Sequence, residues 1–178
     1  MSHVKPALLV LAALTLLCGV VYPLTIAGVA ALFPDRVPEL VGQAFTAPGY
    51  VWSRPTATKY DATTSGATNL GPTNPALADA VRQRIAALQA ADPGARGPVP
   101  ADLVTASASG LDPDISPEAA YFQAARVARA RHVAEAAVRD EIRHHIEDRT
   151  FGVLGAARVN VVELNRALDA RFGGSLVP

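Results

Sequence analysis

The sequence predicts an α+β fold, in which one N-terminal transmembrane helix precedes a mostly helical soluble domain with a small β-sheet. Three observations support this prediction: a long segment without charge at the N-terminus, several helix starts marked by a capping residue, and short runs with strand character. The 178 residues suffice for one domain of ordinary size beside an anchor. We therefore expect an N-terminal tail over residues 1–6, a transmembrane helix over 7–33 and a soluble domain over 34–178.

The N-terminal segment has the length and composition of a membrane span. No charged side chain occurs from residue 6 to residue 34, and a helix over 7–33 would be about 40 Å long, more than the ~30 Å hydrocarbon core requires. Pro23 is tolerated in a membrane helix but is expected to kink it. A cleaved signal peptide is the alternative, with a small-residue cleavage site at 28–30, although its apolar region usually spans only ~7–15 residues.

The charges indicate an orientation and exclude one class of partner. His3 and Lys5 precede the anchor, whereas Asp35 and Arg36 follow it. This excess of positive charge at the N-terminus favours a cytoplasmic N-terminus and an extracytoplasmic soluble domain. All 16 acidic residues and all but one of the 16 Lys and Arg residues follow residue 34, so the domain is nearly neutral. A nucleic acid partner is not expected, because it would require clustered positive charge.

Four helices are predicted in the soluble domain. Asn74 and Ser116 are capping residues, each followed by a proline that fits the first helical position. Asn160 begins a capping-box pattern that is completed by Glu163, and a further helix is expected over 133–147. The residues expected to face the core are Leu77, Val81, Ile85 and Leu88 in the first helix and Val161, Leu164 and Leu168 in the last. In the second helix, a narrow face of small residues suits close helix packing; it consists of Ala120, Ala124, Val127 and Ala128.

The remaining segments are predicted to be strands and loops. Strand character occurs in residues 40–45, 49–52 and 102–106. Residues 107–116 are a turn-rich connection. Residues 54–75 form a long polar loop that contains specific turn-forming residues, so it is expected to have a fixed shape.

The motifs of common enzymes are missing from the sequence. Ser107 and Ser109 precede Asp112, but they lack a Gly-x-Ser-x-Gly motif and a neighbouring histidine, so they are interpreted as turn residues. A membrane-anchored extracytoplasmic serine hydrolase that uses one of these serines stays open as the alternative function. Neither a Gly-x-x-x-x-Gly-Lys-Ser/Thr motif nor a Gly-x-Gly-x-x-Gly motif occurs. We therefore expect no catalytic residue and no directly bound cofactor.

The charged residues of residues 126–148 are interpreted as surface groups. Glu141, His144 and His145 lie close together, but no second motif on a facing helix completes a metal site. No bound metal is therefore expected. Helix-face ion pairs with the neighbouring acidic residues account for the arginines of this region, which are Arg126, Arg129, Arg131, Arg139 and Arg143.

One series of motifs matches a known family along nearly the whole chain. The matching segments are Phe45–Pro48, Tyr50, Arg54–Ala57, Ser65-Gly66, Asn69–Pro72, Asn74-Pro75, Val99-Pro100, Asp102–Ser107, Ser109–Pro113, Ile115–Pro117, Gln123, Arg126–Ala128, Arg131, Arg158–Val161 and Leu164-Asn165. This series resembles the C subunit, KdpC, of the Kdp potassium-transporting P-type ATPase. Residues 35–40 are a shorter connection than is usual in this family, which puts an early strand or hairpin in doubt.

The resemblance implies an accessory subunit of a high-affinity, ATP-driven potassium import complex in the bacterial inner membrane. Its partners would be a channel-like potassium-binding subunit, an ATP-hydrolysing P-type subunit and the lipid bilayer. The resemblance also implies a non-catalytic subunit that stabilises the assembly and acts as a catalytic chaperone, raising the affinity of the P-type subunit for ATP. We expect loop 54–75 to dock on the channel-like subunit; its candidate docking residues are Arg54, Pro55, Ser65, Asn69 and Asn74. Folding of this loop back over its own domain is the alternative.

Overall fold

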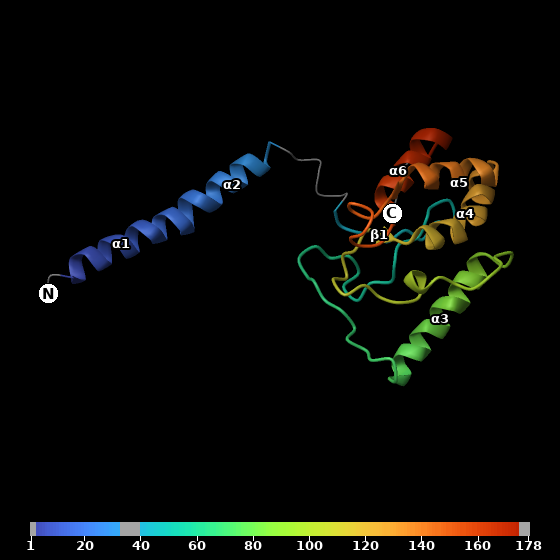
Figure 1. The fold of residues 1–178 in the computed structure, drawn as a ribbon, viewed down its shortest axis with the longest axis horizontal. Helices are drawn as coiled ribbons and strands as arrows, with labels where there is room; N and C mark the ends of the chain where they lie inside the picture. Colours follow the sequence, from blue (N-terminus) through green and yellow to red (C-terminus); the bar gives the residue numbers. More distant parts are fainter. Residues whose placement is uncertain (1–2, 33–39, 175–178) are drawn as a thin grey trace. The chain divides into compact units, whose positions relative to one another are not determined.

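The computed structural model describes residues 3–32 and 40–174, which belong to two compact units, 1–37 and 38–178 (Figure 1). The first unit contains the predicted membrane helix, and the second is the soluble domain. The expected boundary at residues 33 and 34 and the short connection over 35–39 lie outside the described residues. The observed combination of helices with a small antiparallel sheet confirms the predicted α+β class.

The anchor is one continuous helix of three parts: α1 (Val4–Leu16), a π-helical turn (Leu17–Val21) and α2 (Tyr22–Ala30). It begins three residues before the expected start at residue 7. None of its side chains is buried, and the helix, with 27 residues, is long and apolar enough to cross a membrane. At 1.5 Å per residue the helix is about 40 Å long, which covers the hydrocarbon core of a bilayer.

Pro23 explains the π-helical turn. Proline lacks an N–H group, and in an α-helix its ring clashes with the carbonyl of the residue four positions earlier. The wider π-turn directly before Pro23 relieves this clash, so α1 and α2 continue as one rod in Figure 1. The Thr25 hydroxyl donates a hydrogen bond to the Val21 carbonyl at 2.7 Å, which supplies a partner to a backbone group in this turn.

The helices described in the soluble domain are α3 (Pro75–Ala91), α4 (Pro117–Arg131), α5 (Glu135–His144) and α6 (Val161–Phe172). All but α5 begin at the predicted caps; α5 follows Ala134, which provides no side-chain cap. The Asn74 side chain accepts from the Ala76 N–H, and the Ser116 hydroxyl accepts from the Ala119 N–H. The Asn160 side chain accepts from two N–H groups of the first turn of α6. These local signals are correctly identified because a cap needs only its own helix.

The sheet has three short antiparallel strands in the order β1-β3-β2. The strands are β1 (Asp114–Ile115), β2 (Ile146–Glu147) and β3 (Arg158–Asn160). Val159 lies in the centre of the sheet, opposite Ile115 on one side and Ile146 on the other. A hairpin over residues 148–157 connects β2 to β3.

The core lies between the sheet, α4, α5 and α6, which form one cluster in Figure 1, whereas α3 lies apart from them. The predicted small-residue face of α4 is buried and lets neighbouring segments approach the helix closely. The predicted core residues of α6 are also buried. The core-facing residues predicted for α3 are only partly buried. Leu88 is buried, whereas Leu77, Val81 and Ile85 are half-exposed.

The strands predicted over residues 40–45 and 49–52 do not form. The backbone groups of residues 51 and 52 pair with side-chain amides rather than with a neighbouring strand. Val51 N–H donates to Asn165 at 2.8 Å and its carbonyl accepts from the same amide at 2.9 Å. Gln123 binds the N–H and carbonyl of Trp52 in the same way, at 2.8 and 3.1 Å. An amide side chain offers the same donor and acceptor as a peptide group and so replaces a strand here.

Two further predictions about elements are corrected. Residues 102–106 do not form a strand; a 3₁₀ turn, Ala101–Leu103, occupies the start of this segment. Thr105 stabilises the turn, because both its N–H and its hydroxyl donate to the Ala101 carbonyl. The helix expected over 133–147 is shorter at both ends, since α5 ends at His144 and the next residues enter β2.

Candidate partner-docking surface

The first half of loop 54–75 is fixed to its own domain, beginning with Arg54. The Arg54 guanidinium pairs with the Asp112 carboxylate at 3.1 Å, and both side chains are about one quarter exposed. The Nε of Arg54 is buried and has no hydrogen-bond partner within the described part of the chain. Asp112 also accepts from the Asp114 N–H at 3.0 Å. Arg54 thus connects the start of the loop to the segment that precedes β1.

Hydroxyl groups attach the next part of the loop to the turn at Gly110. Thr56 and Thr58 both donate to the Gly110 carbonyl, at 2.6 and 3.0 Å. Gly66 N–H and the Ser65 hydroxyl both donate to the Ser109 carbonyl, at 2.9 and 3.1 Å. Gly110 has a φ of +71°, and a Cβ atom there would lie 2.8 Å from the Gly66 carbonyl oxygen. Only glycine therefore permits this close approach of the loop.

Tyr60 closes the seated part of the loop. Its hydroxyl donates to the Arg54 carbonyl, and its ring lies against Gly42. A Cβ atom at Gly42 would lie 2.7 Å from the Asp112 carbonyl oxygen and would also collide with the Tyr60 ring. Partial burial raises the pKa of the Tyr60 phenol above its usual value.

The second half of the loop, residues 67–73, is different. Its described hydrogen bonds are confined to the turn that leads into α3, where Asn74 N–H donates to the Gly71 carbonyl at 3.0 Å. Asn69 is exposed and has a φ of +51°, a left-handed conformation that asparagine tolerates better than most residues. Leu70, next to it, is half-exposed. This half of the loop presents polar groups and one large apolar side chain, that of Leu70, to the surroundings.

The five candidate docking residues therefore fall into two groups. Arg54, Pro55 and Ser65 belong to the seated half, where they contact residues 107–112. Asn69 belongs to the exposed half, and the exposed Asn74 directly follows this half, where its side chain caps α3. Arg54, Pro55 and Ser65 therefore make contacts within their own domain. Such contacts belong to the alternative interpretation, in which the loop folds back over the domain instead of docking on a partner.

The serines of the 107–112 turn have structural partners. The buried Ser107 hydroxyl accepts from the Gly110 N–H at 2.8 Å, and the Ser109 hydroxyl accepts from the Leu111 N–H at 3.1 Å. Across residues 3–32 and 40–174, no histidine forms a hydrogen bond with either serine. A nucleophilic serine requires a base within reach, so nothing in this geometry supports the serine hydrolase.

Two arginines that were predicted to lie on the surface instead turn into the domain. Arg126 donates to the Pro48 carbonyl at 2.7 Å and to Gln123 at 2.6 Å, and its guanidinium lies 4.3 Å from the centre of the Trp52 ring. Burial lowers the pKa of Arg126 to about 10. The Pro48 carbonyl, the Gln123 side chain and the face of the Trp52 ring thus stabilise the positive charge of Arg126 beneath residues 48–52.

Arg131 holds the same segment from the end of α4. Its guanidinium pairs with Asp169 at 2.7 Å, donates to the Gly49 carbonyl at 2.6 Å and lies 4.9 Å from the centre of the Tyr50 ring. The Arg131–Asp169 ion pair is almost completely buried. The helix-face interpretation is therefore wrong for Arg126 and Arg131, because both bind carbonyls distant in sequence and Arg131 also pairs with the Asp169 carboxylate of α6.

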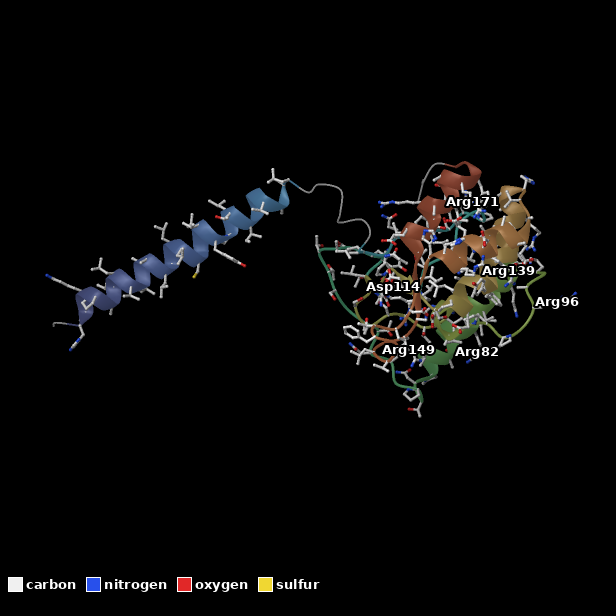
Figure 2. All side chains as sticks on the ribbon, turned by 45° about the horizontal axis from the view of Figure 1, so that its top comes forward. Arg82, Arg96, Asp114, Arg139, Arg149 and Arg171 are labelled. Carbon is white, nitrogen blue, oxygen red and sulfur yellow. The ribbon has the colours of Figure 1, made fainter. Side chains whose placement is uncertain are left out.

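The other arginines of this region form the ion pairs of an exposed surface. Arg139 pairs with Glu135 four residues away, and Arg143 pairs with Asp140 three residues away, as expected. Glu141 pairs with Arg171 of α6 at 2.6 Å. Figure 2 labels Arg139 and Arg171, which are each about half exposed. Arg129 is exposed but pairs with the buried carboxylate of Asp92, at the end of α3, so the helix-face interpretation is wrong for Arg129 as well.

A pocket of about 230 Å³ lies between the start of the loop and α3. Its walls are mostly apolar, with Arg54 and Arg84 as the charged side chains. Arg84 donates to the Val104 carbonyl at 2.6 Å and so ties α3 to the domain. The remaining lining residues are Ala44, Phe45, Trp52, Ser53, Pro55, Thr56, Tyr60, Ala87, Leu88 and Leu103.

Comparison with known proteins identifies the family. The KdpC family, described as the c chain of the K⁺-transporting ATPase, matches residues 37–170, which is more than half of the chain. The chain belongs to the KdpC family. This result confirms the resemblance found in the sequence, and the one-helix anchor fits a single-pass membrane subunit.

Relatives in the KdpC family match almost the full length of the chain. The potassium-transporting ATPase KdpC subunit of Variovorax paradoxus (strain S110) is 52% identical over 184 residues, covering 94% of this chain and 95% of the relative. The corresponding subunit of Polaromonas naphthalenivorans (strain CJ2) is 54% identical over 183 residues, with 93% of each chain covered. That of Methylococcus capsulatus (strain Bath) is 50% identical over 186 residues, covering 95% and 98%.

Proposed function

We propose that this chain is a non-catalytic accessory subunit of a potassium-importing ATPase in the bacterial inner membrane. It stabilises the assembly of a channel-like potassium-binding subunit with an ATP-hydrolysing P-type subunit. The observation that carries this proposal is the KdpC family match over residues 37–170 behind an apolar helix of 27 residues. The turn roles of Ser107 and Ser109 support a subunit without catalytic groups of its own.

The test is to produce the other subunits of the transporter with and without this chain. With the chain, the complex should be recovered intact from detergent and should hydrolyse ATP in response to potassium. Without it, the yield of assembled complex should fall and the concentration of ATP needed for half-maximal activity should rise. Equal yield and equal ATP dependence in both preparations would contradict the proposed accessory role.

The effect on ATP affinity is proposed to be indirect. The sequence has no phosphate-binding loop, and the charge distribution favours an extracytoplasmic domain, away from cytoplasmic ATP. The chain would then act through a coupling free energy between subunits. Titration of the purified full chain with ATP should show no saturable binding, whereas the assembled complex should bind. Saturable micromolar binding by the chain alone would favour direct contact with the nucleotide.

The exposed half of loop 54–75 is the proposed docking segment for the channel-like subunit. Residues 67–73 have a defined turn shape but few contacts with their own domain, as suits an ordered loop that carries an interaction. In the test, Asn69→Gly keeps the left-handed backbone and removes the side-chain amide. We expect an unchanged melting temperature and weaker co-purification with the partner subunits. Gln89→Ala, on the exposed face of α3, is the control that should change neither.

Intact co-purification of the Asn69→Gly variant would contradict docking through Asn69. A second variant, Leu70→Ser, tests the large apolar side chain of the segment in the same assay. If both variants assemble normally and only lower the melting temperature, loop 54–75 is structural throughout.

A further inference from the structure

The hairpin between β2 and β3 concentrates the exposed apolar surface of the soluble domain. Phe151, Val153 and Leu154 are 90%, 72% and 60% exposed. Among the described residues 40–174, the one other large hydrophobic side chain with comparable exposure is Leu40, at 77%. No charged residue occurs from 150 to 157. Large apolar side chains gathered in this way on a surface indicate an interaction site.

The hairpin has a defined shape that turns these side chains outward. Thr150 and Leu154 exchange two backbone hydrogen bonds, each 3.0 Å long, and Gly152 N–H donates to the Arg149 carbonyl at 2.9 Å. Phe151 has a φ of +54°, a left-handed conformation that is unfavourable for an aromatic residue. The turn therefore keeps the Phe151 ring exposed, although the left-handed conformation costs backbone free energy.

The connection to the anchor enters the domain at the base of this hairpin. Leu40, the first described residue of the domain, lines a shallow depression together with Glu147 of β2 and Arg158 of β3. These two strands flank the hairpin. Ten residue steps separate Leu40 from Ala30, the end of the membrane helix, and a chain of that length spans at most about 35 Å. The chain length therefore limits the separation between Leu40, beside the base of the hairpin, and the end of the membrane helix to at most about 35 Å.

We propose that the tip of this hairpin, Phe151, Val153 and Leu154, inserts into the interfacial region of the bilayer that holds the anchor. The tip is too small for a stable protein interface of its own. Even at the roughly 200 Å² that a fully covered aromatic side chain contributes, three such side chains remain below the ~800 Å² per partner of a standard interface. A lipid surface needs only a few inserted apolar side chains, because the anchor already holds the chain at the membrane.

Photo-crosslinking distinguishes the environments of the tip. Phe151 is replaced by the photoreactive analogue p-benzoylphenylalanine in the full chain, which is assembled with its partner subunits in bacterial membranes. On irradiation we expect the chain to gain the mass of one phospholipid. Enzymes that hydrolyse lipid esters should then reduce the mass of this adduct. The same replacement at Gln83, exposed on α3, is the control and should form no lipid adduct.

Two results would overturn the proposal. A protein-sized adduct from position 151 would place the tip against another subunit, and the absence of any adduct would place it in water. The replacement is repeated at Val153, which lies on the same tip, to guard against a local failure to fold. Lipid adducts from position 151 or 153, without one from position 83, support insertion.

Discussion

Arg54 shows how a residue with an apparent binding role can instead hold its own domain together. Its partner, Asp112, is 58 positions away in sequence and the pair is only partly exposed. We expect Arg54→Ala to lower the free energy of unfolding by about 1 kcal/mol. Asp112→Ala should lower it further, because it leaves the partly buried Arg54 charge without a counter-charge. Thermal melting of the full chain in detergent, followed by circular dichroism, measures both effects.

The control for this pair is Arg82→Ala. Arg82 pairs with Asp79 three residues earlier on the exposed side of α3, and such surface pairs contribute little to stability. Its removal should hardly change the melting temperature. If Arg54→Ala behaves like Arg82→Ala in melting and yet prevents assembly of the complex, Arg54 acts on a partner subunit after all.

Tyr60 is expected to make the free energy of unfolding depend on pH in the alkaline range. Partial burial raises the pKa of its phenol in the folded state, so the protonated form stabilises the fold below the ordinary tyrosine pKa of 10. This contribution is lost as the pH rises through the folded-state pKa. Tyr60→Phe removes the hydrogen bond to the Arg54 carbonyl and should lower stability at neutral pH by about 1 kcal/mol. Melting curves across the alkaline range should show this difference shrinking, whereas a constant difference would contradict the titration of Tyr60.

Sequence reasoning is weakest for buried polar residues. Gln123 and Asn165 were recognised only as members of a family pattern, yet each hydrogen-bonds both the N–H and the carbonyl of one backbone residue. Arg126 and Arg131 were assigned to the surface because acidic residues lie near them in sequence. Their partners include carbonyls of residues 48 and 49 and, for Arg131, the Asp169 carboxylate. Such contacts depend on tertiary distance, which composition and periodicity do not contain.

At the level of elements, the accuracy of prediction follows the range of the deciding interaction. The caps at Asn74, Ser116 and Asn160 act within one helical turn, and all three were predicted correctly. The strands were not, because strands of two or three residues exist only through pairing with distant segments. The candidate loop was correctly expected to be ordered in its first half, but its division into a seated and an exposed half required the structure.

Helix α3 is expected to be the least protected helix of the soluble domain. It buries Leu88 alone, whereas α4 buries seven residues and α6 five, and a pocket of about 230 Å³ lies beside it. Few buried contacts permit local opening. Hydrogen–deuterium exchange of the full chain should therefore show faster exchange in α3 than in α4 or α6. Arg84→Ala, which removes the bond to the Val104 carbonyl, should accelerate exchange in α3 and leave α6 unchanged; equal protection of the three helices would refute this expectation.

At the scale of the whole molecule, orientation in the membrane decides which compartment the domain occupies. The positive groups at His3 and Lys5, opposed by the mixed charges of Asp35 and Arg36, favour a cytoplasmic N-terminus. We predict that a cysteine at Gln83, introduced after Cys18→Ala, reacts with a membrane-impermeant maleimide in intact spheroplasts. A cysteine at Ser2, the control, should react only after the membrane is permeabilised. The reverse pattern would place the domain in the cytoplasm, beside ATP, and would remove the reason for an indirect effect on nucleotide affinity.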